Sequence, residues 1–142
     1  MIILDTNVVS EMMEPSPAPS VKVWLNAKDG FQFYMTTITI AEIAYGIHKL
    51  PLGKRRSFIE STFEEKVLNM FDDRVFSFDK PAARLYGEIM NKRKKIGRPM
   101  GTLDAQIAAI ALANDASLAT RNTRDFEHCG LNLINPFLHV IS

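Results

Sequence analysis

Four acidic residues from distant parts of the chain are the strongest candidates for chemistry: Asp5, Glu42, Asp104 and Asp125. Hard cations such as Mg²⁺ and Mn²⁺ prefer carboxylate oxygens as ligands, and a carboxylate can also take or orient a proton of water. Because like charges crowded into one crevice repel each other, a shared site implies a cation that neutralises them. If the fold gathers these acids, we expect a divalent metal site.

The hydrophobic pattern indicates the elements that must position these acids. Apolar runs bounded by turn residues predict short strands, and apolar residues at helical spacing predict helices between them, one of which covers residues 54–70. Strands alternating with helices are typical of an α/β domain with a mostly parallel sheet. The predicted strands cover residues 1–4, 31–36, 75–78, 117–120 and 131–134.

The acids follow the carboxyl ends of the predicted strands, which is where ligands bind to parallel sheets. Asp5 directly follows the first strand, and Asp125 comes shortly after the fourth. Glu42 is predicted in the first turn of the helix after the second strand, and Asp104 opens the helix that begins after Gly101. The four carboxylates are therefore expected to point into one crevice.

Each acid also has a purely structural interpretation. Asp5 could cap a helix, and residues 39–42, Thr-Ile-Ala-Glu, fit a capping box in which Glu42 serves only its own helix. Asp104 could complement a helix dipole, and Asp125 could be a turn residue. The joint occurrence of four such acids favours a site over four independent caps.

Bulk properties indicate one soluble globular domain over residues 1–142, with 46% hydrophobic and 23% charged residues. The three histidines and the single Cys129 lack the spacing of zinc ligands, and one cysteine forms no internal disulfide. Asp5 interrupts the opening apolar run, so no signal peptide is recognised, and no run approaches the roughly 18 residues of a membrane span. We therefore expect a cytoplasmic protein.

Two basic clusters are candidates for binding phosphates, although the formal net charge is only +1. One cluster is residues 54–56, and the other holds five cations without an acid. A solvated helix end, where cations complement the dipole, is the structural alternative for both. The larger cluster consists of Lys92, Arg93, Lys94, Lys95 and Arg98.

Four stretches together make a family resemblance. They are MIILDTNVVSE at 1–11, TTITIAEIAYGI at 36–47, GTLDAQIAAIA at 101–111 and LATRNTRDF at 118–126. Because these four stretches occur in this order, the sequence resembles the PIN-domain ribonucleases, in particular the VapC toxins of bacterial toxin–antitoxin pairs and their FitB-like relatives. The resemblance implies a three-layer α/β/α sandwich with a mostly parallel central sheet.

The resemblance also implies roles for individual residues. Asp5, Glu42 and Asp104 match the family's first three acids, with Asp5 and Asp104 as the metal ligands. Some relatives carry the fourth acid where this chain has Asn122, and others place an acid three residues after an Asn. This chain has the second pattern, so we assign Asp125 as the fourth catalytic acid.

Three further residues are candidates for positioning the carboxylates or water. Thr6 directly follows Asp5, Thr120 ends the fourth predicted strand, and Asn122 is a neutral hydrogen-bonding partner for Asp125. A neutral residue at one acidic position leaves open whether the site holds one or two metal ions.

The implied activity is hydrolysis of RNA phosphodiester bonds with Mg²⁺ or Mn²⁺, with tRNA among the possible substrates. The family also implies a small VapB-like antitoxin, whose tail fills the active-site groove, and a homodimer. The alternative is a degenerate PIN-like module that binds RNA, or regulates, without cutting. Against a phosphatase of the haloacid type, Asn7 stands where that class has its second Asp.

Overall fold

A five-stranded, fully parallel sheet forms the centre of the computed structural model, which describes residues 1–141. The strand order is β3-β2-β1-β4-β5, so β1 and β4 are neighbours in the middle of the sheet. All five predicted strands are present, with shorter bounds than predicted. The strands are β1 (Ile2–Leu4), β2 (Phe33–Thr36), β3 (Val75–Phe76), β4 (Ser117–Ala119) and β5 (Leu133–Ile134).

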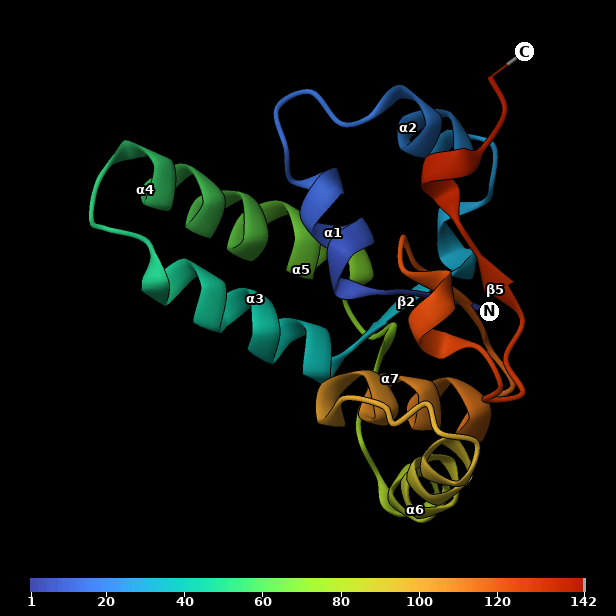
Figure 1. Cartoon of the computed structure of the whole chain (residues 1–142). Helices are drawn as coiled ribbons and strands as arrows, with labels where there is room; N and C mark the ends of the chain where they lie inside the picture. The colour runs from blue at the N-terminus through green and yellow to red at the C-terminus, as the bar shows by residue number, and fades with distance from the viewer. Residues whose placement is uncertain (142) are drawn as a thin grey trace.

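Helices cover both faces of this sheet (Figure 1). Successive side chains of a strand point to opposite faces, and β1 shows this directly. Ile2 and Leu4 belong to one buried core, whereas Ile3 belongs to the other. The three-layer α/β/α prediction is therefore confirmed. The helices are α1 (Thr6–Met12), α2 (Pro19–Asn26), α3 (Thr37–Lys49), α4 (Lys54–Ser61), α5 (Leu68–Phe71), α6 (Lys80–Lys95) and α7 (Thr102–Ala113).

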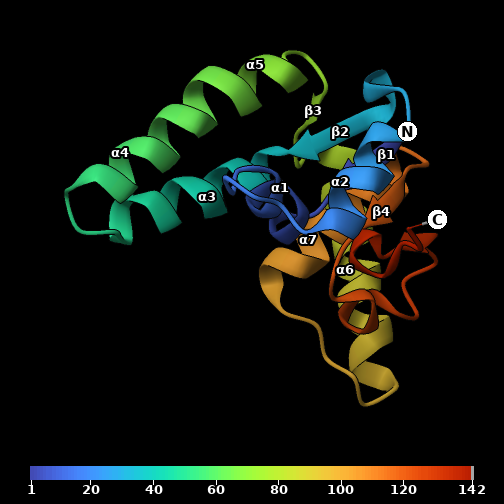
Figure 2. The same cartoon turned by 90° about the horizontal axis from the view of Figure 1, so that it is seen from above.

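The helical run predicted at residues 54–70 is also present, with a π-helical segment, η2 (Thr62–Val67), between α4 and α5. The Thr62 hydroxyl donates to the Phe58 carbonyl at 2.7 Å, which competes with the regular helix ladder at this point. With α3, this run forms a helical hairpin that extends beyond the sheet (Figures 1 and 2). The hairpin begins at the carboxyl end of β2, because α3 directly follows that strand.

The α6–α7 pair packs on the other face of the sheet, where alanines of α7 are fully buried. Three short 3₁₀ helices complete the described residues, 1–141, in which no helix is both long and apolar enough to cross a membrane. The 3₁₀ helices are η1 (Gly30–Gln32), η3 (Thr123–Phe126) and η4 (Pro136–Leu138).

Candidate active site

Asp5 lies at the point where the strand order reverses, between β1 and β4. Its carboxylate is the N-cap of α1 and accepts a hydrogen bond from the Thr6 backbone N–H at 2.8 Å. The Thr120 hydroxyl donates to Asp5 Oδ2 at 2.7 Å, and the Asn7 side chain donates to the same oxygen at 3.2 Å. Asp5 is thus a helix cap and also a buried carboxylate at the usual ligand position of such sheets.

Glu42 lies further along α3 than the sequence suggested. The helix begins at Thr37 and is capped by Thr36, whose hydroxyl oxygen accepts from the Thr39 backbone N–H at 3.2 Å. The predicted capping box at residues 39–42 and the first-turn placement of Glu42 are therefore wrong. Instead, the Thr6 hydroxyl donates to Glu42 Oε1 at 2.9 Å, which directs this carboxylate toward the start of α1.

Asp104 lies in the first turn of α7, as predicted, after the N-cap Gly101. Burial first, and then the negative charges of Asp5, Asp125 and Glu42, together raise its pKa to about 6, against a smaller lowering by the Arg93 charge. A carboxylate that served only to complement the helix dipole would have a lowered pKa. The charged form of Asp104 is therefore disfavoured here, which the dipole interpretation does not explain.

The acids form a cluster of like charge in which the nearby Arg93 charge only partly offsets the repulsion at Asp104. Burial, and to a smaller extent neighbouring carboxylates, raise the pKa of Asp5 and of Glu42 as well. The two ion pairs found within residues 1–141, Arg56–Glu60 and Arg98–Glu127, involve none of these acids. A set of carboxylate oxygens with uncompensated charge fits a hard divalent cation.

These side chains are not preassembled as a ligand cage. Within residues 1–141, no three Asp, Glu, His or Cys side chains lie close enough together to hold a metal ion jointly. The fit to a cation therefore rests on donor chemistry and on charge. The carboxylates would have to rotate toward each other on binding.

Asp125 is exposed on η3, and its charge contributes to the raised pKa of both Asp5 and Asp104. Asn122 is a hydrogen-bonding partner of Asp125 through its backbone, because its carbonyl accepts from the Asp125 backbone N–H at 3.0 Å. Its own backbone N–H donates to the Thr120 hydroxyl at 3.1 Å. The chain thus brings Asp125 to the edge of the acidic cluster, with Asn122 supporting Thr120.

Sequence reasoning missed two positioning residues. Asn7 binds Asp5 and Thr120 through its Nδ2, and its Oδ1 accepts from the Arg121 backbone N–H at 3.0 Å. The buried Thr39 hydroxyl is hydrogen-bonded to the Thr6 hydroxyl at 3.0 Å. Asn7 was visible as an amide two residues after Asp5, whereas Thr39 required knowledge of how α3 packs on α1.

The larger basic cluster divides in the structure. Arg93 is only 4% exposed because it lies on the same helix face as the buried Ile89, and this burial argues against the predicted contact with RNA. Arg98 pairs with Glu127 at 2.9 Å. Lys92, Lys94 and Lys95 are exposed in the last turn of α6, where they remain candidates for binding RNA and also complement the helix dipole.

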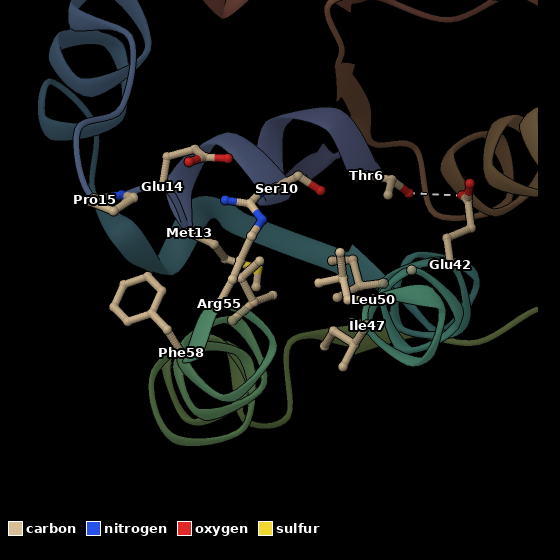
Figure 3. Close-up of a pocket in the computed structure, with 13 residues that line it drawn as sticks. Thr6, Ser10, Met13, Glu14, Pro15, Glu42, Ile47, Leu50, Arg55 and Phe58 are labelled. Carbon is tan, nitrogen blue, oxygen red and sulfur yellow. Dashed lines mark hydrogen bonds between the residues drawn. The ribbon is translucent and has the colours of Figure 1, made fainter. Parts of the chain in front are cut away.

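A groove of about 280 Å³ leads from the acidic cluster along the space between α1, α3 and α4. Thr6 and Glu42 lie at one end, and Phe58 and Pro15 at the other (Figure 3). Its walls are largely apolar, and Arg55 projects from α4 toward the α1 side (Figure 3). The groove is continuous with the acidic cluster through Glu42.

The fold and site define a parallel α/β domain with a carboxylate cluster at its switch point. Residues 2–130 match the PIN domain family, and the chain belongs to it. It is 44% identical to the plasmid stability protein StbB of Pseudomonas syringae pv. tomato, over 96% of this chain and 99% of that protein. It is 40% identical to the VapC ribonuclease Y4jK of Sinorhizobium fredii, over 96% and 98% of the two chains.

A solved structure agrees with these relatives. The structure of FitAB bound to an IR36 DNA fragment contains a chain that is 34% identical to this one. It superposes with a TM-score of 0.91 and covers 100% of this chain and 99% of that chain. The family and the fold inferred from the sequence are confirmed.

Replacing Thr120 with valine is expected to lower the free energy of unfolding by about 1–3 kcal/mol at neutral pH. The buried carboxylate of Asp5 would lose its closest side-chain donor, and valine supplies no hydroxyl. Urea unfolding measures the change, with Thr37→Val as the control because Thr37 is exposed. Equal, small losses in both variants would contradict the inferred role of Thr120.

Proposed function

We propose that this chain is a single-domain endoribonuclease that hydrolyses RNA phosphodiester bonds with Mg²⁺ or Mn²⁺, and that it is the toxin of a VapBC-type toxin–antitoxin pair. The observation that carries the proposal is the cluster of Asp5, Glu42 and Asp104, whose pKa values are all raised and which take part in no ion pair within residues 1–141. Membership of the PIN-domain family supports the same activity.

The residues divide into three roles. Asp5 and Asp104 would hold the cation, because they are the acids at the end of β1 and the start of α7. When bound, a divalent ion polarises a phosphate oxygen and lowers the pKa of water. Glu42 has a raised pKa and is oriented by Thr6, so it can accept the proton of the attacking water.

Asp125 is exposed at the rim of the cluster. From η3, it can orient the same water that Glu42 contacts from α3. Attack at phosphorus with loss of the 3′ oxygen leaves a 5′ phosphate and a 3′ hydroxyl. The 2′ hydroxyl of the RNA takes no part. The exposed Lys92, Lys94 and Lys95 are proposed to attract the polyanionic substrate.

Incubation of the purified protein with total tRNA in Mn²⁺ tests the proposal, with Asp104→Asn prepared identically. Discrete, EDTA-sensitive fragments made only by the unmodified protein are expected, and their ends identify the bond that is cut. RNA retained but uncut by folded, antitoxin-free protein would favour the degenerate binding module. Equal cleavage by both proteins would contradict the assignment of Asp104.

We further propose that the antitoxin occupies the groove of Figure 3, and that the toxin is a homodimer, as the resemblance to VapC toxins implies. The groove is largely apolar and ends at the acids, so it suits an amphipathic segment with apolar anchors and a cation at one end. Such a segment would block the substrate and neutralise the carboxylates together.

Phe58→Asp is expected to weaken binding of the cognate antitoxin by at least about tenfold, since the half-exposed Phe58 lines the groove and an aromatic side chain that a partner buries is a frequent hot spot. The matched control is Leu52→Asp, because Leu52 is 87% exposed and does not line the groove. Calorimetric titration measures the affinity, and RNA cleavage by free toxin should be the same in both variants. Equal affinities would place the antitoxin elsewhere.

A further inference from the structure

Arg93 is a buried cation whose guanidinium is held by backbone carbonyl groups. Its Nε donates to the Arg98 carbonyl at 2.7 Å, and its Nη1 donates to the carbonyls of Asp125 at 2.8 Å and Glu127 at 3.0 Å. The Cys129 sulfur lies 3.7 Å from the same Nη1. A buried arginine stays charged, so its position depends on acceptors of this kind.

The acceptors belong to two segments that carry active-site acids. Arg98 lies in the loop between α6 and α7, six residues before Asp104. Asp125 itself provides one acceptor, and Glu127 lies directly after η3. Arg93 thus joins the segment that leads to Asp104 to the segment that contains Asp125. The planar, forked guanidinium can reach both segments at once, whereas a lysine ammonium cannot reproduce that geometry.

We infer that Arg93 is a positioning residue of the active site: its guanidinium binds the α6–α7 loop and the turn at η3 together, and so fixes Asp125 relative to Asp104. The inference rests on the proposed nuclease function for its catalytic consequence. The structural part of the inference is independent of that function: the Arg93 hydrogen bonds to the two loops form a clamp between them.

A second, exposed connection links the same segments and provides a matched control. Arg98 Nη1 pairs with Glu127 Oε2 at 2.9 Å, and Arg98 Nη2 donates to the Arg124 carbonyl at 3.1 Å. Exposed ion pairs contribute little to structure, whereas a buried fork bound to several carbonyls has no solvent to replace it. Glu127→Gln removes the ion pair and leaves Arg93 intact.

The test compares Arg93→Ala, Arg93→Lys and Glu127→Gln in the full chain. For Arg93→Ala we expect kcat for RNA cleavage to fall about 100-fold, the loss typical of a misplaced catalytic group, with KM nearly unchanged. Guanidinium ion at millimolar concentration should restore part of this kcat. Glu127→Gln should keep the kcat of the unmodified protein. The kcat of Arg93→Lys should lie between those of the unmodified protein and Arg93→Ala, and guanidinium should not raise it.

Two kinetic outcomes would overturn the inference. A raised KM with unchanged kcat would make Arg93 an RNA contact, and an unchanged kcat per folded molecule with a lower Tm would make it a purely structural residue. Arg93→Lys retains the charge and serves if the alanine variant does not fold.

Hydrogen exchange separates failure of the clamp from failure of the proposed function, because it requires no RNA. In Arg93→Lys, faster amide exchange confined to residues 98–101 and 123–129 is expected, with Glu127→Gln unchanged. If the unmodified protein cuts no RNA, this pattern still supports the clamp. Unaltered exchange in Arg93→Lys would overturn it whatever the activity.

Discussion

Asp104→Asn is expected to raise the free energy of unfolding of the metal-free protein at neutral pH by about 1 kcal/mol, while it abolishes RNA cleavage. The folded protein must hold Asp104 charged at neutral pH although burial and three neighbouring carboxylates raise its pKa to about 6. Asparagine fills the same space without the charge. The figure allows for solvent screening, since Asp104 is only partly buried.

The pH dependence of this gain follows from the direction of the shift. The pKa of Asp104 rises from 3.8 in the unfolded chain to about 6 in the fold, so the folded protein binds more protons between these values. Stability of the unmodified protein therefore falls as pH rises through this window. The advantage of Asp104→Asn should be complete above the window and absent below it. Asp5 and Glu42 act in the same direction, because their pKa values are also raised.

Urea unfolding in EDTA across this pH range measures the effect, and Asp73→Asn is the matched control because Asp73 is exposed in a turn. The control should show no comparable gain at any pH. If Asp104→Asn were instead less stable than the unmodified protein at every pH, the helix-dipole interpretation of Asp104 would prevail.

The sheet and the place of the acids could be predicted because both depend on local patterns. Strands buried on both faces form short apolar runs, as residues 1–4 do, and parallel strands direct their carboxyl ends to one edge. Asp5 and Asp104 therefore lie as predicted relative to their elements. The start of α3 was misplaced because Thr36 and Thr39 are both plausible caps, and packing against α1 decides between them.

The burial of Arg93 could have been predicted from its helical spacing, although its place in a basic run suggested exposure. Within a run of four cations it looks like part of a basic patch, yet it lies four residues after Ile89 and shares that residue's buried face. Helical periodicity therefore separates Arg93 from its exposed neighbours. Two of its acceptors, at Asp125 and Glu127, lie about thirty residues away in sequence, so only the fold identifies them.

Divalent metal is expected to raise the Tm of the unmodified protein by about 8 °C at neutral pH. A ligand at one hundred times its Kd stabilises a fold by about 2.7 kcal/mol, and each kcal/mol shifts the Tm of a domain of this size by roughly 3 °C. Below the pKa of Asp104 the shift should shrink, because that carboxyl must lose a proton before it can bind a cation.

Thermal scans with Mn²⁺ or EDTA should separate the site from nonspecific binding. Asp73→Asn should keep the full shift, whereas Asp5→Asn and Asp104→Asn should lose most of it. An undiminished shift in Asp104→Asn would mean that the cation binds elsewhere on the chain.

The same charge thus has opposite effects in the two conditions. Asp104→Asn should have the higher Tm in EDTA, because an uncompensated carboxylate is removed, and the lower Tm in Mn²⁺, because a ligand is removed. A helix cap or dipole partner would shift the Tm in one direction whether or not metal is present. The inversion of Tm order between EDTA and Mn²⁺ is therefore the result that only a metal-binding role for Asp104 produces.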